Sequence, residues 1–167
     1  GDFQFDVPVS GIVRAEIGPD FMPQVVEGRL MAEAGRIGST KNEDDVIEID
    51  KAEMNLDWDS TRRSLVAPFK IFSGRNRVTL LSQFEAPGEP GLPWRLIVTG
   101  GSIVLGAAQT DEVPLILNRI LMRALLDPAK KRIELLQGEV AGGGVNLAMS
   151  GSIDYSSGEP RLSGGMV

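Results

Sequence analysis

Two stretches of the chain repeat the same strand-turn-strand plan about 68 residues apart, the separation of Asp59 from Asp127. The first, unit A, spans about residues 46–101, and the second, unit B, spans about residues 115–167. In each unit an alternating run ends at that aspartate, and a basic pair, a second strand pattern and a glycine turn follow. A unit that cannot bury its own apolar face must stack on its neighbours. The repeat therefore predicts one extended structure built from similar units, preceded by N-terminal strands over residues 1–45.

Apolar and polar residues alternate with period two in both units, which predicts strands with one apolar and one polar face. We therefore expect an all-β fold, an antiparallel meander of repeated strand units that forms a curved, one-sided sheet or groove. The predicted apolar-face residues, either core or lipid-facing, are Ala52, Met54, Leu56, Trp58, Ile120, Met122, Leu126, Val145, Leu147, Met149 and Ile153. Alternation alone does not separate an open groove from a closed core, because a sandwich buries the same face against a second sheet.

Residues 112–126 are locally ambiguous. Asp111 could cap a helix there, and Pro114 is tolerated near a helix start. The repeat instead aligns residues 120–126 with the clearly alternating run 52–58. Because non-local packing overrides local propensity, we favour a strand, with a short helix at about 112–126 as the alternative.

Composition narrows the chemistry. The 167 residues include no Cys and no His, which removes thiol nucleophiles, His-based triads and the commonest metal ligand. A net charge of −6 argues against nucleic-acid binding, which needs a basic surface. The six Met include Met54, Met122 and Met149 on the predicted apolar face, where they suit either adaptable core packing or lipid contact.

Other candidate sites have simpler interpretations. The acidic stretch 42–45, with Glu48 and Asp50, lacks the ordered spacing and glycine of a calcium loop, so we expect a solvated loop. Gly142-Gly143-Gly144 precedes a strand pattern rather than a helix, so we expect a turn and not a phosphate cradle. No carboxylate pair stands in a recognisable catalytic motif. We therefore expect no enzymatic activity, no metal and no cofactor.

Several short segments together resemble the extramembrane region of AsmA-like envelope proteins, the family that includes TamB and YhdP. They are Val7-Pro8-Val9-Ser10-Gly11, Glu27-Gly28-Arg29, Ile49-Asp50-Lys51-Ala52-Glu53, Leu56-Asp57-Trp58-Asp59, Thr99-Gly100-Gly101, Leu125-Leu126-Asp127-Pro128-Ala129 and Ser150-Gly151-Ser152-Ile153-Asp154-Tyr155. They are turn-and-strand patterns rather than catalytic signatures. The family has no catalytic residues to assign here.

The resemblance implies an excised segment of a Gram-negative periplasmic protein, anchored to the inner membrane by parts outside this segment. It implies a long curved β-sheet whose apolar groove supports phospholipid transport and outer-membrane biogenesis in the cell envelope, or serves as an envelope scaffold. Phospholipid is then the expected partner, and bare sheet edges favour self-association. The alternative is a self-contained β-sandwich that binds a protein or glycan partner.

Overall fold

The computed structural model describes residues 3–39, 46–107, 111–156 and 161–167. All regular structure in these ranges is β-strand, which confirms the predicted all-β antiparallel fold. The strands are β1 (Phe3–Asp6), β2 (Val9–Ile17), β3 (Pro23–Ala32), β4 (Gly35–Ser39), β5 (Val46–Ile49), β6 (Lys51–Asp59), β7 (Ser64–Ser73), β8 (Asn76–Glu85), β9 (Trp94–Leu105), β10 (Leu115–Leu117), β11 (Arg119–Asp127), β12 (Arg132–Gly142), β13 (Val145–Asp154) and β14 (Arg161–Met166).

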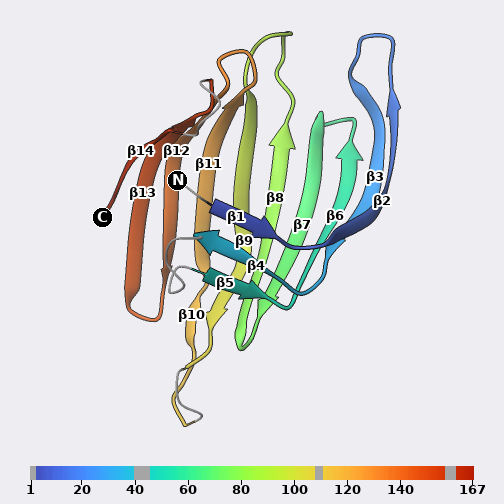
Figure 1. Cartoon of the computed structure of the whole chain (residues 1–167). Coiled ribbons are helices and arrows are strands. Elements are labelled where there is room, and N and C mark those ends of the chain that lie inside the picture. Colours follow the sequence, from blue (N-terminus) through green and yellow to red (C-terminus); the bar gives the residue numbers. More distant parts are fainter. Residues whose placement is uncertain (1–2, 40–45, 108–110, 157–160) are drawn as a thin grey trace.

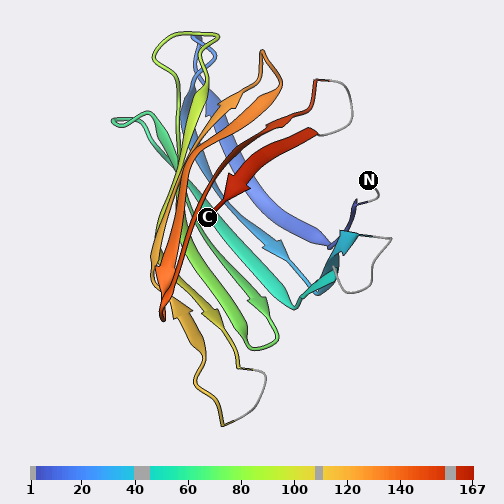
Figure 2. The ribbon, with the colours of Figure 1, turned by 90° about the vertical axis from the view of Figure 1, so that its left-hand side faces the viewer.

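Most strands form one 11-stranded antiparallel sheet in the order β14-β13-β12-β11-β9-β8-β7-β6-β3-β2, with β10 paired to β9. Successive strands are neighbours almost throughout, as in a meander (Figure 1). Seen from the side, the long strands bend, so that the sheet has a concave and a convex face (Figure 2). The sheet stays open, with β2 at one edge and β14 at the other.

A second sheet of three short strands, β1-β4-β5, lies on the concave side and crosses the long strands (Figures 1 and 2). The backbone N–H of Asp50 donates to the Phe72 carbonyl at 2.8 Å, and the Ser73 hydroxyl donates to the Glu48 carbonyl. These bonds tie β5 to the end of β7. Residues 46–58, which the sequence pattern predicts as one strand, are therefore two strands: the chain bends at Asp50 and passes from one sheet to the other.

The sequence repeat is also a repeat of structure. Strands β6 and β11 have the same length at a spacing of 68 residues, and each ends in the same turn. In that turn, Asp59 Oδ1 accepts the Arg62 backbone N–H at 3.0 Å, and Asp127 Oδ1 accepts that of Lys130 at 3.0 Å. Arg63 and Lys131 follow in the left-handed region, with φ of 51° and 49°. The β-sheet repeat therefore extends to strand length, to the hydrogen bond of the turn and to the left-handed residue that follows it.

The repeat continues upstream of unit A. Strand β3 pairs with β6 as β9 pairs with β11, and the matched partners, Leu30 with Met54 and Val98 with Met122, are again 68 residues apart. Downstream, β12 carries one more residue than β7, and its register with β13 shifts between Leu135 and Gly138. This β-bulge absorbs the extra residue while keeping the apolar positions on one face.

Residues 119–127 are strand β11, which confirms the strand expectation over the helical alternative. The reason is non-local: β11 pairs with β9 on one side and with β12 on the other. These two ladders satisfy its backbone groups better than an isolated helical turn would.

Proline in a sheet is normally found at an edge or a bulge, but Pro68 lies inside the central strand β7. The pairing between β6 and β7 is interrupted at Pro68: the ladder passes from the pair Met54–Phe69 directly to the pair Asp57–Val66. Proline has no N–H to donate, so the ladder omits this position rather than placing it at the edge of the sheet.

The molecule is a thin layer rather than a closed core. Its accessible surface is 11393 Å², whereas a compact monomer of its 18.0 kDa mass exposes about 8,000 Å². The three-stranded sheet is much smaller than the sheet it faces, so this is not a sandwich of two comparable sheets. Among the described residues, no second layer covers much of the concave face.

Candidate functional site

The candidate site is the concave face of the large sheet. Residues paired across neighbouring strands point to the same face, so the register assigns faces directly. Leu30, Met54, Phe69 and Leu80 pair in sequence across β3, β6, β7 and β8, and Met122 stands in the same relation on β11. All the residues predicted for the apolar face lie in this set: Ala52, Met54, Leu56, Trp58, Ile120, Met122, Leu126, Val145, Leu147, Met149 and Ile153.

The concave face is sheltered but not sealed. Along residues 76–82 of β8 and residues 145–150 of β13, its residues are half-buried or buried, whereas their convex-face neighbours are exposed. Full burial is confined to small or central side chains such as Ala67, Ala124 and Val98. The Ser82 hydroxyl, also buried, donates to the Ala67 carbonyl. The side chains of this face pack against one another while keeping part of their surface in contact with solvent.

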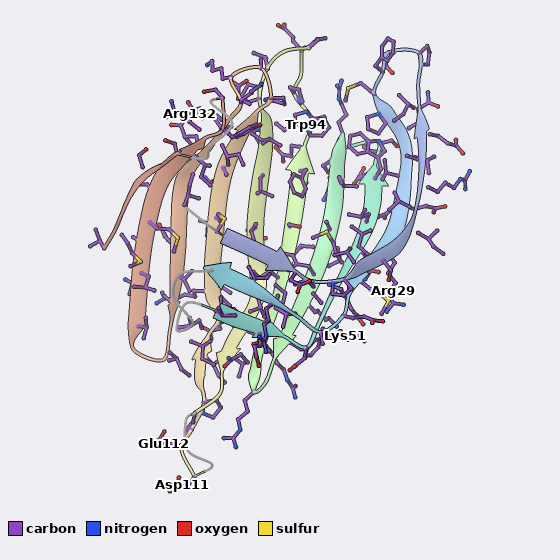
Figure 3. The ribbon with its side chains drawn as sticks, viewed as in Figure 1. Arg29, Lys51, Trp94, Asp111, Glu112 and Arg132 are labelled. Atoms are coloured by element: carbon purple, nitrogen blue, oxygen red, sulfur yellow. The ribbon has the colours of Figure 1, made fainter. Side chains whose placement is uncertain are left out.

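On β3 and β6 the convex face is charged where the concave face is apolar. Glu53 forms ion pairs with Lys51 at 2.7 Å and with Arg29 at 3.5 Å, and Figure 3 shows Arg29 and Lys51 close together at one end of the sheet. The hydrogen bond from the Lys51 ammonium lowers the pKa of Glu53 below its usual value. On these two strands the two faces of the sheet therefore differ sharply in polarity.

Unit A fills its concave face with aromatic rings, and unit B does not. Trp58 on β6 corresponds to Leu126 on β11. Matched pairing places Gly138 of unit B where unit A has Phe69, and Ile153 where it has Phe84. The Met149 side chain covers Gly138, because a Cβ at Gly138 would lie 2.5 Å from Met149 Cγ.

The smaller residues of unit B leave a hollow of about 430 Å³ across β12, β13 and β14. Its apolar side chains belong to Ile133, Leu135, Met149, Ile153 and Met166. This volume is within the roughly 300–1,000 Å³ of small-molecule pockets. The hollow of about 160 Å³ near Met54 and Phe69, on the other half of the same face, is smaller.

Glycines form the floor of the unit B hollow. Gly151 and Gly164 pair across β13 and β14, and a Cβ on either would lie 2.5 Å from a backbone carbonyl oxygen of the other strand. Only glycine fits this close approach. The matching pair in unit A is Ser82 and Val98, both buried.

Sequence reasoning missed the hollow, because its signal depends on the position of the extra residue in β12, which only the register gives. Aligning the two units at the extra residue of β12 places Gly138, Gly151 and Gly164 against larger residues. Tyr155 follows Ile153 in the same alternation, and its backbone N–H donates to the Lys131 carbonyl at 2.9 Å.

The other sequence candidates do not add a site. Gly143 and Gly144 lie in the β12–β13 turn with positive φ, as expected. The acidic residues 42–45 lie outside the described residues. Within the described ranges no acidic cluster could hold a metal ion, and no helix is long and apolar enough to cross a membrane. The indole N–H of Trp58 is buried and has no hydrogen-bond partner among the described residues.

Comparison of the chain with protein-family models, with curated proteins and with solved structures yields no match.

Proposed function

We propose that the concave face is a non-enzymatic, lipid-conducting groove that shields phospholipid acyl chains from water. The observation that carries this proposal is a continuous apolar surface, running across the strands from β3 to β13, without a second layer of comparable size. Exposing an acyl chain to water costs about 0.8 kcal/mol per methylene. A surface that offers apolar contact along its whole length lowers that cost at every step of transit.

We extend the proposal to the setting in which such a groove is useful. The AsmA-like segments favour the periplasm, a parent protein anchored to the inner membrane, and a role in phospholipid transport and outer-membrane biogenesis. A less specific form of the same proposal is that the sheet serves as a scaffold in the cell envelope. The edge strand β2, with Ile12 82% exposed, favours pairing with another strand or another copy.

Native mass spectrometry of the purified chain tests the groove. We expect bound phospholipid with the native sequence and its loss in Met54→Glu and Leu147→Glu, because a carboxylate on the apolar face must be desolvated by a bound acyl chain. Asn55→Glu and Asn146→Glu place the same charge on the convex face next to these positions and should keep the lipid. Absence of lipid from the native chain, or equal loss in both pairs of variants, would contradict the proposal.

A further inference from the structure

The small sheet is the same structural element as the end of unit B. In its β4–β5 ladder Ile37 pairs with Ile47. In the β9–β10 ladder Leu105 pairs with Leu115, and each of these residues lies 68 positions later. Strand β1 pairs with β4 as the start of β8 pairs with the end of β9. The end of the repeat is therefore folded onto the concave side at the start of unit A, whereas it continues in the large sheet in unit B (Figures 1 and 2).

A glycine marks the place where this end folds over. A Cβ on Gly35 of β4 would lie 2.3 Å from the Asp6 carbonyl oxygen, so the two strands approach this closely only because the side chain is absent. Unit B has Ile103 at the matching position, and there β9 runs without a break over Trp94–Leu105. The folded end and the in-plane end therefore differ at the residue on which the corner closes.

The register shows which face of the small sheet is turned inward. Ile49 corresponds to Leu117 of unit B, which pairs with Ile103. Ile103 pairs with Val78, and Val78 lies on the concave face through its pairing with Ile71. Because paired residues share a face, Ile49 and the residues on its side of the small sheet continue the concave face around the corner. Ile49 is buried there, as this assignment requires.

The two faces of the small sheet differ in chemistry. On the outer face Arg36 pairs with Glu48 at 3.4 Å, and both side chains are exposed. The inner face carries Ile37, Ile47 and Ile49, with no polar side chain among those that the structure describes. Ile47 is nevertheless 61% exposed, so the large sheet does not cover this apolar face beyond its base.

The hydrogen bonds that the described residues form between the two sheets lie at that base. There the Asp50 N–H donates to the Phe72 carbonyl at 2.8 Å, as the Asn118 N–H donates to the Ala141 carbonyl at 3.1 Å in unit B. Farther out, the central strand β4 is paired on both sides and has no free edge. A molecule on the inner face therefore meets apolar side chains, where a peptide backbone or a lipid headgroup would lose its hydrogen bonds to water without replacement.

We infer that the small sheet is a second wall of the groove, and that Ile37 and Ile47 contact the acyl chain of a phospholipid bound on the concave face. An acyl chain suits both surfaces, because it is apolar along its length and removes Ile47 from water without needing a hydrogen bond. This inference rests on the proposed function, and it adds a second lipid-contacting surface to the large sheet.

Thiol labelling tests the second wall, because the native chain has no Cys and a single introduced Cys reports one position. Vesicles of phosphatidylethanolamine and phosphatidylglycerol supply the lipid. At about ten times the dissociation constant, Ile47→Cys should react with a maleimide about tenfold more slowly, since only the lipid-free chain reacts. Glu48→Cys, the next residue on the outer face, is the matched control and should react at an unchanged rate. Leu147→Cys reports the concave face of unit B and should be protected.

The outcomes separate the second wall from the groove. Protection of Leu147→Cys without protection of Ile47→Cys overturns the wall and leaves the groove standing. Equal protection of Ile47→Cys and Glu48→Cys also overturns it, because a strand paired along the edge of β5 would cover both faces. Protection of neither Ile47→Cys nor Leu147→Cys contradicts both proposals. Glycerophosphoethanolamine, a headgroup without acyl chains, should protect no position, and its protection of Ile47→Cys would overturn the acyl contact.

Gly35→Ile tests the corner, because it installs the residue of unit B where a Cβ has no room. In this background Ile47→Cys should lose its protection, while Leu147→Cys should keep it and so report an intact large sheet. Ala34→Ile, at the exposed neighbouring position, is the control and should leave both rates unchanged. Full protection of Ile47→Cys beside Gly35→Ile would contradict a wall that depends on the folded end. The labelling comparison in the native background does not depend on this variant.

Discussion

Units A and B share a backbone plan but differ in what occupies their concave face. The same aspartate turn, the same left-handed residue and the same ladder recur in both. Unit A nevertheless carries Trp58, Phe69 and Phe84 where unit B carries Leu126, Gly138 and Ile153. Turns and alternation therefore determine the course of the sheet, while side-chain volume determines where the sheet is filled and where it is open.

Removing a ring from unit A should have the largest effect on stability. Phe69→Ala should lower the free energy of unfolding by about 3 kcal/mol, because it deletes a large apolar side chain between two strands. Lys70→Ala, its convex-face neighbour, should change it by less than about 0.5 kcal/mol. Urea unfolding measures both. Equal effects would mean that the rings of unit A do not hold the sheet together.

Exchanging matched residues should sharpen the contrast between a filled and an open unit. Ala67 is 0% exposed, so Ala67→Leu, which installs the residue of its counterpart Leu135, should cost about 2 kcal/mol by overpacking. Ile153→Phe enlarges a side chain at the hollow of unit B and should cost less than about 0.5 kcal/mol. Chemical denaturation of both variants checks this order, and the reverse order would contradict the assignment of open space to unit B.

The turn aspartates should behave alike, because here the two units are the same. Asp59→Ala and Asp127→Ala each remove an acceptor of a backbone N–H, and each should lower stability by about 1 kcal/mol. Asn in either position keeps the acceptor oxygen and should recover most of the loss. Thermal unfolding of the four variants checks the equivalence, which a clear difference between the two sites would break.

The smallest effect concerns the convex face, where Glu53 of unit A corresponds to Leu121 of unit B. The Lys51 hydrogen bond lowers the pKa of Glu53, so this contact stabilises the fold at neutral pH. Its contribution is lost as the pH falls through the lowered pKa and the carboxylate takes up a proton. In Glu53→Gln the acid limb of the stability profile should be slightly flatter, and an unchanged limb would contradict the contact.

The main sheet was predictable because its signals are local and repeated. The 68-residue spacing identified β11 as a strand against helix-like residues such as Asp111 and Pro114, and alternation assigned the two faces. The turn at Asp127 followed from the turn at Asp59. Each of these features depends on residue types a few positions apart, or on a comparison of the two units.

The small sheet and the hollow were not predicted. β1 and β4 are short, so neither has enough alternation to be recognised as a strand. They also pair across about 30 residues, and no local pattern predicts so distant a partner. The bend at Asp50 had a weak signal: apolar positions change from odd at Ile47 and Ile49 to even at Ala52 and Met54. The hollow depends on Gly151 meeting Gly164, and on the bulge in β12, which appear only once the register is known.

The most direct test of the central claim is to map where a lipid touches the sheet. A phospholipid with a photoactivatable acyl chain would be bound, irradiated, and its attachment sites located by peptide mass spectrometry. Lipid on the concave face predicts attachment at Met149 and Ile153 of unit B, with little at the alternate residues Ala148 and Ser152. Attachment divided equally between these two pairs, or confined to the convex pair, would contradict the claim.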